Sequence, residues 1–400
     1  MTKALTFAVA PLLALALAPG LSAQQDGDAM VANAGFERFV PKEQSSSTQL
    51  DYTIWSEALD AFVVWMGPSL REQAPSVASD LGSRVVYGHD SRLRMEGNRF
   101  AFSFVEPEIA KSFTAYREDL QAVADQVDIQ SLSRDEQLAY WLNLHNVAVI
   151  EQIAKAYPLK YPARLKIGAD DALMDEARFI TVNGVALSPK DIRTRIVYPN
   201  WSNPDVIYGF FRGDIGGPSI DDDAFTAANV DMKLTLAGEE FVNSMRGTEK
   251  VGDTLWVSRL YEEAAPFYFR DWNTDLKAHL LTHADPQTTQ FVQAASDVEA
   301  RIYEEDIADL AGGERAPSYS NIVVNAGTPN ERSQGFRIPQ NVARYMGERA
   351  QKREKLRERG LLGQVIVLPM GEASEPAEET QGSETVAPET GSEGSESPQG

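Results

Sequence analysis

Three polar side chains lie close together in one strongly apolar segment. Asn143, His145 and Asn146 occur within the run LAYWLNLHNVAVI, and a helical wheel places both asparagines among apolar neighbours. A buried amide needs partners, because each unsatisfied group costs about 1–3 kcal/mol. The asparagines therefore either bind the backbone of a neighbouring loop, or orient a ligand or an oxyanion. His145 is either a satisfied, partly buried histidine or a general base beside them.

A glycine-rich segment places two opposite charges between aromatic residues and glycines. Residues 210–219 read FFRGDIGGPS, whose backbone amides can form an anion nest with Arg212 as a charged arm and Asp214 as an acceptor. The alternative is a packing loop in which glycine allows close backbone approach. The segment lacks the GxxxxGK[ST] order of a phosphate loop and the GxSxG order of a nucleophile elbow. Ser219 has no activating base nearby in the sequence.

Two further histidines have a spacing that suits a metal. His279 and His283, in the motif HLLTH, are four residues apart on a predicted helix. The motif lacks the glutamate of HExxH, and no third ligand is evident. We therefore interpret both as partly exposed histidines and predict neither a metal site nor a cofactor. The chain has no cysteine, which excludes thiol chemistry and thiolate metal sites.

The elements that must position these residues are mostly helical. Apolar periodicity predicts helices over 52–66 and 109–123, and a third over 133–158 that begins with a Ser133–Glu136 capping box. Asn183-Gly184 predicts a hairpin within 178–186. The sequence further predicts helices over 188–197, 226–245, 258–267 and 274–282, and a strand over 254–257. The fold class is α+β: a single mainly helical domain with a small β-hairpin or short sheet, flanked by disordered ends.

The two ends of the chain differ in composition from this domain. Lys3, an apolar run and the small residues before position 24 have the order of a signal peptide. We divide the chain into a signal peptide (1–23), a flexible leader (24–50), a globular domain (51–312), an irregular linker (313–341), a charged helix (342–360) and a disordered acidic tail (371–400). We expect the charged helix to be solvated.

The charge and the predicted export limit the partners. The formal net charge is −22, and an acidic chain without a basic face is a poor candidate for nucleic-acid binding. No later segment is apolar enough for stable membrane insertion after signal cleavage. We expect a periplasmic or secreted protein.

A longer pattern resembles a known family. The block EQLAYWLNLHNVAVIEQIAKAYPLK, followed by FITVNGVALSPKDI and a loop ending in Gly-Gly-Pro-Ser, resembles domain of unknown function family 547, over roughly residues 100 to 285. The resemblance implies a compact α+β domain of unestablished activity with a glutamate, a histidine and two cysteines. This chain has Arg193 at the position of the glutamate and Ile207 at that of the histidine, with Arg212 and Gly217 at those of the cysteines.

The resemblance therefore implies the scaffold and not the thiol chemistry. We expect a non-catalytic or degenerate domain of the cell envelope that binds a small polar or anionic ligand, or an envelope protein. Its candidate ligand-binding residues are Asn143, Asn146, Arg212, Asp214 and His145. The alternative is an exported hydrolase with a rewired active site around the glycine-rich loop, so the question of enzyme activity stays open.

Overall fold

The computed structural model describes residues 35–42, 46–77, 88–315, 319–324 and 334–362. The predicted signal peptide and the predicted acidic tail lie outside the described residues. The fold class is confirmed as α+β, since helices dominate and the strands form small sheets of two or three. None of the helices in these ranges is long and apolar enough to cross a membrane.

The central element is α4 (Arg134–Ala156), which is buried along nearly its whole length. Its apolar side chains cover more than half of the circumference, as expected of a helix enclosed on several sides. Ser133 caps it by accepting from the backbone N–H of Glu136. The predicted capping box is only half formed, because the Glu136 carboxylate accepts from the backbone of Leu50 instead.

The N-terminal part of the chain packs on one side of this helix. Helix α3 contacts α4 extensively, and the ring of Trp55 in α2 stacks on Tyr116 of α3. Within the predicted leader, Phe39 is buried and its ring meets Trp141 edge to face. The elements are η1 (Glu37–Phe39), α2 (Thr53–Phe62), β1 (Val63–Val64), β2 (Arg99–Phe100), η2 (Phe102–Phe104), α3 (Pro107–Gln126) and η3 (Ile129–Ser131).

Short strands and a distorted helix follow α4. The predicted hairpin is present, with Ile180 paired to Leu187 and both turn residues, Asn183 and Gly184, at positive φ. Ser188 and Asp191 form a complete capping box, after which the helix widens into a π-helix. The elements are η4 (Pro162–Arg164), β3 (Lys166–Ile167), β4 (Ala172–Leu173), β5 (Ile180–Val182), β6 (Val185–Leu187), α5 (Pro189–Asp191), the π-helix η5 (Ile192–Val197) and α6 (Tyr198–Asn200).

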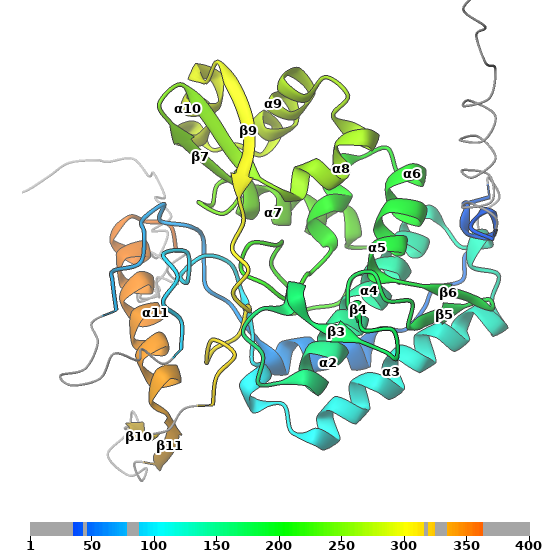
Figure 1. Cartoon of the computed structure of the whole chain (residues 1–400), viewed down its shortest axis with the longest axis horizontal. Helices are drawn as coiled ribbons and strands as arrows, with labels where there is room; N and C mark the ends of the chain where they lie inside the picture. Colours follow the sequence, from blue (N-terminus) through cyan, green and yellow to red (C-terminus); the bar gives the residue numbers. More distant parts are fainter. Residues whose placement is uncertain (1–34, 43–45, 78–87, 316–318, 325–333, 363–400) are drawn as a thin grey trace, which may run out of the picture. The chain divides into compact units, whose positions relative to one another are not determined.

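Residues 204–302 contain a three-stranded sheet of order β7-β8-β9. Strands β7 and β8 are antiparallel and β8 and β9 are parallel; α9 and α10 lie beside them (Figure 1). The elements are η6 (Pro204–Gly209), α7 (Val230–Val242), β7 (Thr248–Val251), β8 (Thr254–Ser258), α8 (Leu260–Tyr268), α9 (Trp272–His283), α10 (Pro286–Ala294) and β9 (Asp297–Ile302).

The charged helix at the end of the described chain packs on the rest of it. Helix α11 (Gln340–Glu358) buries Tyr345 and Lys352, and Glu348 pairs with Arg94 at 2.8 Å. Figure 1 shows α11, in orange, beside the blue segment that precedes α3. The expectation of a solvated helix is therefore wrong, because Tyr345 and its apolar neighbours form a small core with Met66. Strands β10 (Tyr319–Val324) and β11 (Gln334–Pro339) pair within the predicted linker.

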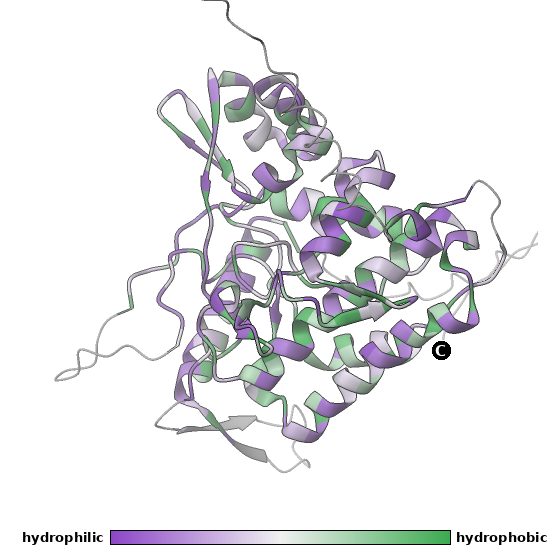
Figure 2. Ribbon diagram, turned by 45° about the vertical axis from the view of Figure 1, so that its right-hand side comes forward, coloured by the Kyte–Doolittle hydropathy of each residue, from purple (hydrophilic) through white to green (hydrophobic). Residues whose placement is uncertain are grey.

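Hydrophobic and hydrophilic residues alternate along the outer helices, as Figure 2 shows. The apolar stripes of these helices contribute to one large cluster of buried side chains around α4. This arrangement fixes the polar side chains of α4 inside the core, where they need protein partners.

Candidate functional site

The two asparagines of α4 hold backbone segments of the loops around them. Asn143 donates to the carbonyl of Phe225 at 2.7 Å and accepts from the N–H of the same residue at 3.1 Å. Asn146 donates to the carbonyl of Gly209 at 3.0 Å and accepts from the N–H of Phe211 at 2.9 Å. Both side chains are buried. Their amides therefore fix the start of the glycine-rich loop and the segment after it.

His145 is buried between one asparagine and one arginine. Its Nδ1 lies 3.0 Å from Oδ1 of Asn146, and its Nε2 lies 3.0 Å from Nη1 of Arg193. Because the guanidinium only donates, we assign the proton to Nδ1. Burial and the charge of Arg193 lower the pKa of His145 to about 3. The ring is neutral at pH 7, and the lone pair on its Nε2 already accepts a hydrogen bond from Arg193.

Arg193 is the buried centre of an ion cluster. Its guanidinium donates to both carboxylate oxygens of Asp175, each at 2.7 Å, and to both of Glu263, at 2.8 and 3.0 Å. Arg212 binds Glu263 as well, with its shortest contact at 2.7 Å. We call Asp175, Arg193, Arg212 and Glu263 the ion cluster. It joins the loop after β4, η5, the glycine-rich loop and α8.

The charges of the ion cluster compensate each other. Burial opposes ionisation of Glu263, but Arg212 and Arg193 outweigh it and hold the pKa of this carboxyl well below its usual range. Burial likewise opposes ionisation of Asp175, and Arg193 lowers its pKa. Two cations and two anions therefore face each other, which is the condition under which buried charges are tolerated.

Asp214 lies beside the ion cluster and has other partners. It accepts from the hydroxyl of Tyr303 at 2.7 Å and from the backbone N–H of Gly217 at 2.9 Å. Burial raises the pKa of Asp214 to about 6, although Tyr303 and Arg212 act in the opposite direction. The structure thus brings His145, Asn146 and Arg212 to one connected region through Arg193, with Asp214 at its edge and Asn143 one turn away along α4.

The comparison with protein families agrees with this scaffold. Residues 129–242 match the family described as "Protein of unknown function, DUF547". The chain carries a DUF547 domain. The matched segment begins before α4 and ends with α7, so it contains the asparagines, the hairpin, Arg193 and the glycine-rich loop. No curated protein and no solved structure matches the chain.

The ion cluster reaches beyond the matched segment of the DUF547 domain. Glu263 lies in α8, outside residues 129–242, and it joins both arginines. The resemblance placed Arg193 at a glutamate position and Arg212 at a cysteine position, and nothing in their sequence neighbourhood identified Glu263 as their shared partner. The carboxylates nearest to the two arginines in sequence, Asp191 and Asp214, bind other partners, so sequence proximity pointed away from Glu263.

Ser219 of the DUF547 domain is also engaged. Its hydroxyl donates to the Glu240 carboxylate at 3.1 Å and accepts from Arg246 at 2.9 Å. The carboxylate that the sequence did not identify is thus present in space, but Glu240 also pairs with Arg246. A base whose charge is held by a guanidinium is a weak activator of a hydroxyl.

His279 and His283 lie in a different cluster, together with Asp205. Both imidazoles are buried, so the interpretation of two partly exposed histidines is wrong. Helix α9 turns both rings inward against η6 and α7, where Tyr208 and Gly238 pack on them. Asp205 is 78 residues before His283, which is why the motif HLLTH alone showed no third acidic partner.

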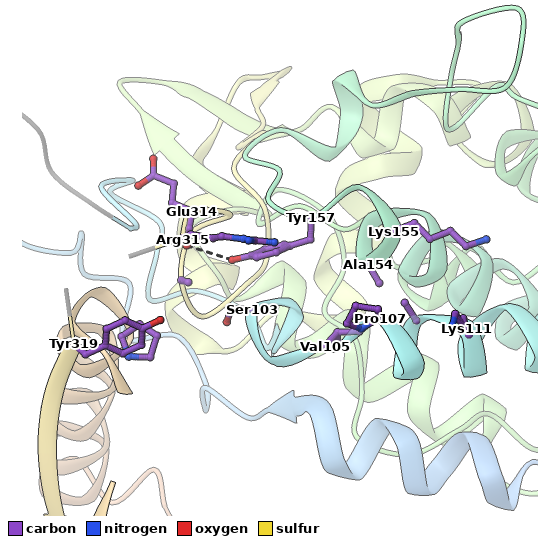
Figure 3. A pocket seen from close by; sticks show the side chains of 13 residues that line it. Ser103, Val105, Pro107, Lys111, Ala154, Lys155, Tyr157, Glu314, Arg315 and Tyr319 are labelled. Atoms are coloured by element: carbon purple, nitrogen blue, oxygen red, sulfur yellow. Dashed lines mark hydrogen bonds between the residues drawn. The ribbon is translucent and has the colours of Figure 1, made fainter. Parts of the chain in front are cut away.

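A cavity of about 560 Å³ adjoins the DUF547 domain at the C-terminal end of α4. Figure 3 shows Tyr157, Arg315 and Ser103 at one side of it, and Lys111 and Lys155 on the helices at the other. None of the five predicted ligand-binding residues lines this cavity. The volume lies within the usual range of small-molecule sites, about 300–1,000 Å³.

Proposed function

We propose that this chain is an exported protein of the cell envelope that binds a small anionic ligand in the cavity beside its DUF547 domain, without catalysing a reaction. The observation that carries the absence of catalysis is the ion cluster. It occupies the region of Arg193 and Arg212, where the family pattern implied a glutamate and a cysteine. A catalytic group needs a free lone pair, proton or nucleophile facing a substrate.

Each candidate for the alternative, an exported hydrolase, already has protein partners. His145 accepts from Arg193, and Asp214 accepts from Tyr303 and Gly217. Arg212 is held by Glu263. Activity would require these bonds to break, which would leave buried charges without partners at a cost of several kcal/mol. We therefore favour the binding function over hydrolysis.

Export is supported by the N-terminal sequence. Lys3, the uncharged apolar run after it and the small residues Ser22 and Ala23 follow the order of a cleaved secretory signal. A periplasmic or secreted location follows from this pattern. A test is the mass of the protein recovered from the envelope fraction of an expressing bacterium: loss of the first 23 residues supports the proposal, and an intact N-terminus in the cytosol contradicts it.

The cavity has the chemistry of a site for an amphipathic anion. Three cations line it, Lys111, Lys155 and Arg315, against one acid, Glu314. The remaining wall is largely apolar or aromatic, with Val105, Pro107, Ala110, Ala154, Tyr157, Ala311, Tyr319 and Pro339. A carboxylate with a short apolar tail can satisfy both parts of such a wall, since ligand sites combine apolar surface with a few charged groups.

Each lysine of the cavity pairs with a glutamate, Lys111 at the surface and Lys155 with a buried one. Lys155 lies 2.6 Å from Glu151, which Arg117 also binds, and Lys111 lies 2.9 Å from Glu108. The exposed pair of Lys111 contributes little free energy, about 0–1 kcal/mol, so this ammonium group can turn towards a bound carboxylate at small cost. Lys155 is itself 44% exposed, and Glu151 keeps Arg117 as a partner when Lys155 also contacts a ligand.

Calorimetry with matched probes tests the binding proposal. We expect octanoate to bind the purified chain at least about 10-fold more tightly than acetate or octan-1-ol, because only octanoate offers both charge and apolar surface. The variant Lys111→Gln/Lys155→Gln/Arg315→Gln should lose this preference. The matched control, Arg178→Gln/Lys166→Gln/Lys190→Gln, removes three exposed, paired cations outside the cavity and should keep it.

Two results would overturn the proposal. Equal affinities for octanoate and octan-1-ol, or equal losses in the two triple variants, would remove the cavity as an anion site. Turnover of ester, peptide or glycan substrates that disappears in Arg212→Ala and Asp214→Ala would instead establish the hydrolase alternative.

A further inference from the structure

A second polar cluster lies apart from the ion cluster, where the last turn of α9 meets η6. Helix α9 supplies His279 and His283, and η6 supplies Asp205. The two histidines are four residues apart and therefore share one face of the helix. Both are less than 10% exposed, whereas the Asp205 side chain is 13% exposed and opens the cluster towards solvent. Figure 1 shows α9 above α8 and beside β9.

The ligand atoms of the three side chains converge on one point. Nε2 of His283 lies 2.8 Å from Oδ1 of Asp205, and Nδ1 of His279 lies 3.9 Å from the same oxygen. One potential ligand atom of each residue lies within 4.8 Å of the others. A tetrahedral Zn²⁺ with bonds of about 2.0–2.1 Å separates its ligand atoms by about 3.3 Å. The observed separations bracket this value, so side-chain rotations of small size bring the three atoms into coordination.

The orientation of the His279 ring is fixed by a hydrogen bond on the side away from Asp205. The hydroxyl of Tyr208 lies 2.8 Å from Nε2 of His279, and it also meets the hydroxyl of Tyr261 at 3.1 Å. With Nε2 engaged in this way, Nδ1 is the nitrogen that faces Asp205. Zinc-binding histidines characteristically donate the N–H of their second ring nitrogen to a partner of this kind, which fixes the tautomer and the ring plane.

Apart from the contact of its Nε2 with Asp205, the ring of His283 has no hydrogen bond within the described part of the chain. Nδ1 of His283 is buried and makes no hydrogen bond within the described part of the chain. It lies close to Gly238, where an added Cβ would come within 3.0 Å of it. Because no donor holds Nδ1, the ring proton can move there and leave Nε2 free as a ligand atom.

The donor types of the cluster suit a cation. Two imidazole rings and one carboxylate offer nitrogen and oxygen lone pairs, which are ligands that Zn²⁺ takes in proteins.

We propose that Asp205, His279 and His283 bind a Zn²⁺ ion, with the fourth coordination position open to water. Two imidazole nitrogens and one carboxylate oxygen form a donor set that this borderline ion accepts in proteins, with three protein ligands and one exchangeable position. The ion ties α9 to η6, the segment that leads into the glycine-rich loop. This site goes beyond the proposed function, since it shares no residue with the cavity or the ion cluster.

Titration of the chelator-treated chain with ZnCl₂ tests the proposal directly. We expect one equivalent to bind with a dissociation constant of about 1 µM or lower, and the melting temperature to rise with ZnCl₂ concentration. Co²⁺ in place of Zn²⁺ should give the visible absorption of a four-coordinate ion. His283→Gln and His279→Gln should each weaken binding at least about 100-fold, and Tyr208→Phe about 10-fold.

A matched control lies on the same helix. Asp275→Asn removes a carboxylate of α9 that is not one of the three ligands, one turn before His279, and keeps an oxygen for the bond from the backbone N–H of Asp271. It should bind Zn²⁺ as the unchanged chain does, whereas Asp205→Asn should not. Circular dichroism establishes that each variant is folded before its affinity is compared.

The four histidines of the chain give a test that needs no variant. With histidine labelled by ¹⁵N, one equivalent of Zn²⁺ should shift the ring signals of His279 and His283 and leave those of His89 and His145 in place. Binding weaker than about 100 µM, or equal shifts for all four rings, would overturn the proposal. Binding that survives in both histidine variants would assign the ion to other carboxylates and overturn it too.

Discussion

Nη1 of Arg193 donates to Nε2 of His145 at 3.0 Å, so a buried cation is bound to a neutral, buried histidine. Arg193 comes from η5 and His145 from the middle of α4, and both side chains are fully buried. The arginine is acceptable there because Asp175 and Glu263 bind its remaining donors. The position that the family resemblance assigns to a glutamate thus carries the opposite charge, and its surroundings are acidic to match.

The first prediction concerns the charge balance of the ion cluster. Arg193→Ala leaves Asp175 without its cation and Glu263 with Arg212 alone. We expect the free energy of unfolding to fall by about 3–5 kcal/mol, the usual cost of removing one partner of a buried pair. Urea denaturation followed by circular dichroism measures it.

A matched control for this variant is Arg178→Ala. Arg178 also pairs with an aspartate, Asp191, but its side chain is 54% exposed. Its loss should cost less than about 1 kcal/mol. Comparable losses in the two variants would contradict the view that burial makes Arg193 structurally essential.

The sequence predicted the elements around the site better than the contacts inside it. The spacing of apolar residues located α4, and Asn183-Gly184 located the hairpin, because these signals depend on near neighbours. The shared partner of Arg193 and Arg212, Glu263, lies in α8, about 50 to 70 residues further along the chain. Periodicity carries no information about which distant carboxylate approaches a guanidinium.

The same difference between local signals and long-range contacts explains why the expectation for α11 was wrong. The charged helix α11 was expected to be solvated, because its few apolar residues gave no continuous stripe. Its burial depends on Tyr345, whose hydroxyl donates to the backbone of Arg94, and on Lys352, whose ammonium group donates to the carbonyl of Met95. Long charged side chains can bury their stems while their polar ends find backbone acceptors.

The second prediction concerns the asparagines of α4. Asn146→Ala removes the partners of two buried backbone groups, the carbonyl of Gly209 and the N–H of Phe211. Each of the two unsatisfied groups costs about 1–3 kcal/mol, so we expect a loss of about 2–6 kcal/mol in urea denaturation.

Asn273→Ala provides the comparison for this variant, since Asn273 also makes two hydrogen bonds but at an exposed position. Water replaces these partners, and the loss should be about 1 kcal/mol. If Asn146→Ala were as stable as Asn273→Ala, the glycine-rich loop would not depend on the amide.

The third prediction concerns the pH dependence of stability. The pKa of His145 is about 3 in the folded chain, because of burial and Arg193, and an unperturbed histidine has a pKa of 6.5. Between these values the unfolded chain binds the proton and the folded chain does not. Protons therefore favour unfolding, and the stability that the neutral ring contributes is complete above pH 6.5 and is lost as the pH falls towards 3.

The variant His145→Gln isolates this contribution. Between pH 6.5 and 4.5 its stability should fall less steeply than that of the unchanged chain, by at most about 1.4 kcal/mol per pH unit. Urea denaturation at several pH values measures both slopes. Other titrating groups, such as Asp214 with its raised pKa, contribute to both proteins and cancel in the difference. Parallel slopes would show that His145 is protonated as readily in the folded chain as in the unfolded one.

The fourth prediction separates two reasons for a glycine at positive φ. Gly213 has φ +86°, and an added Cβ would lie 2.1 Å from Cδ1 of Ile153 and 3.3 Å from Cβ of Pro162. Gly184, in the hairpin turn, has φ +72° but open space around the same position. Gly184→Ala therefore incurs only backbone strain, about 1 kcal/mol. Gly213→Ala incurs the same strain and also forces Ile153 out of its place against the loop, so its total loss should reach about 2–4 kcal/mol.

Urea denaturation of the two variants in parallel measures the difference. Equal losses would mean that the close approach of the glycine-rich loop to α4 tolerates a methyl group, and that backbone conformation alone requires the glycine.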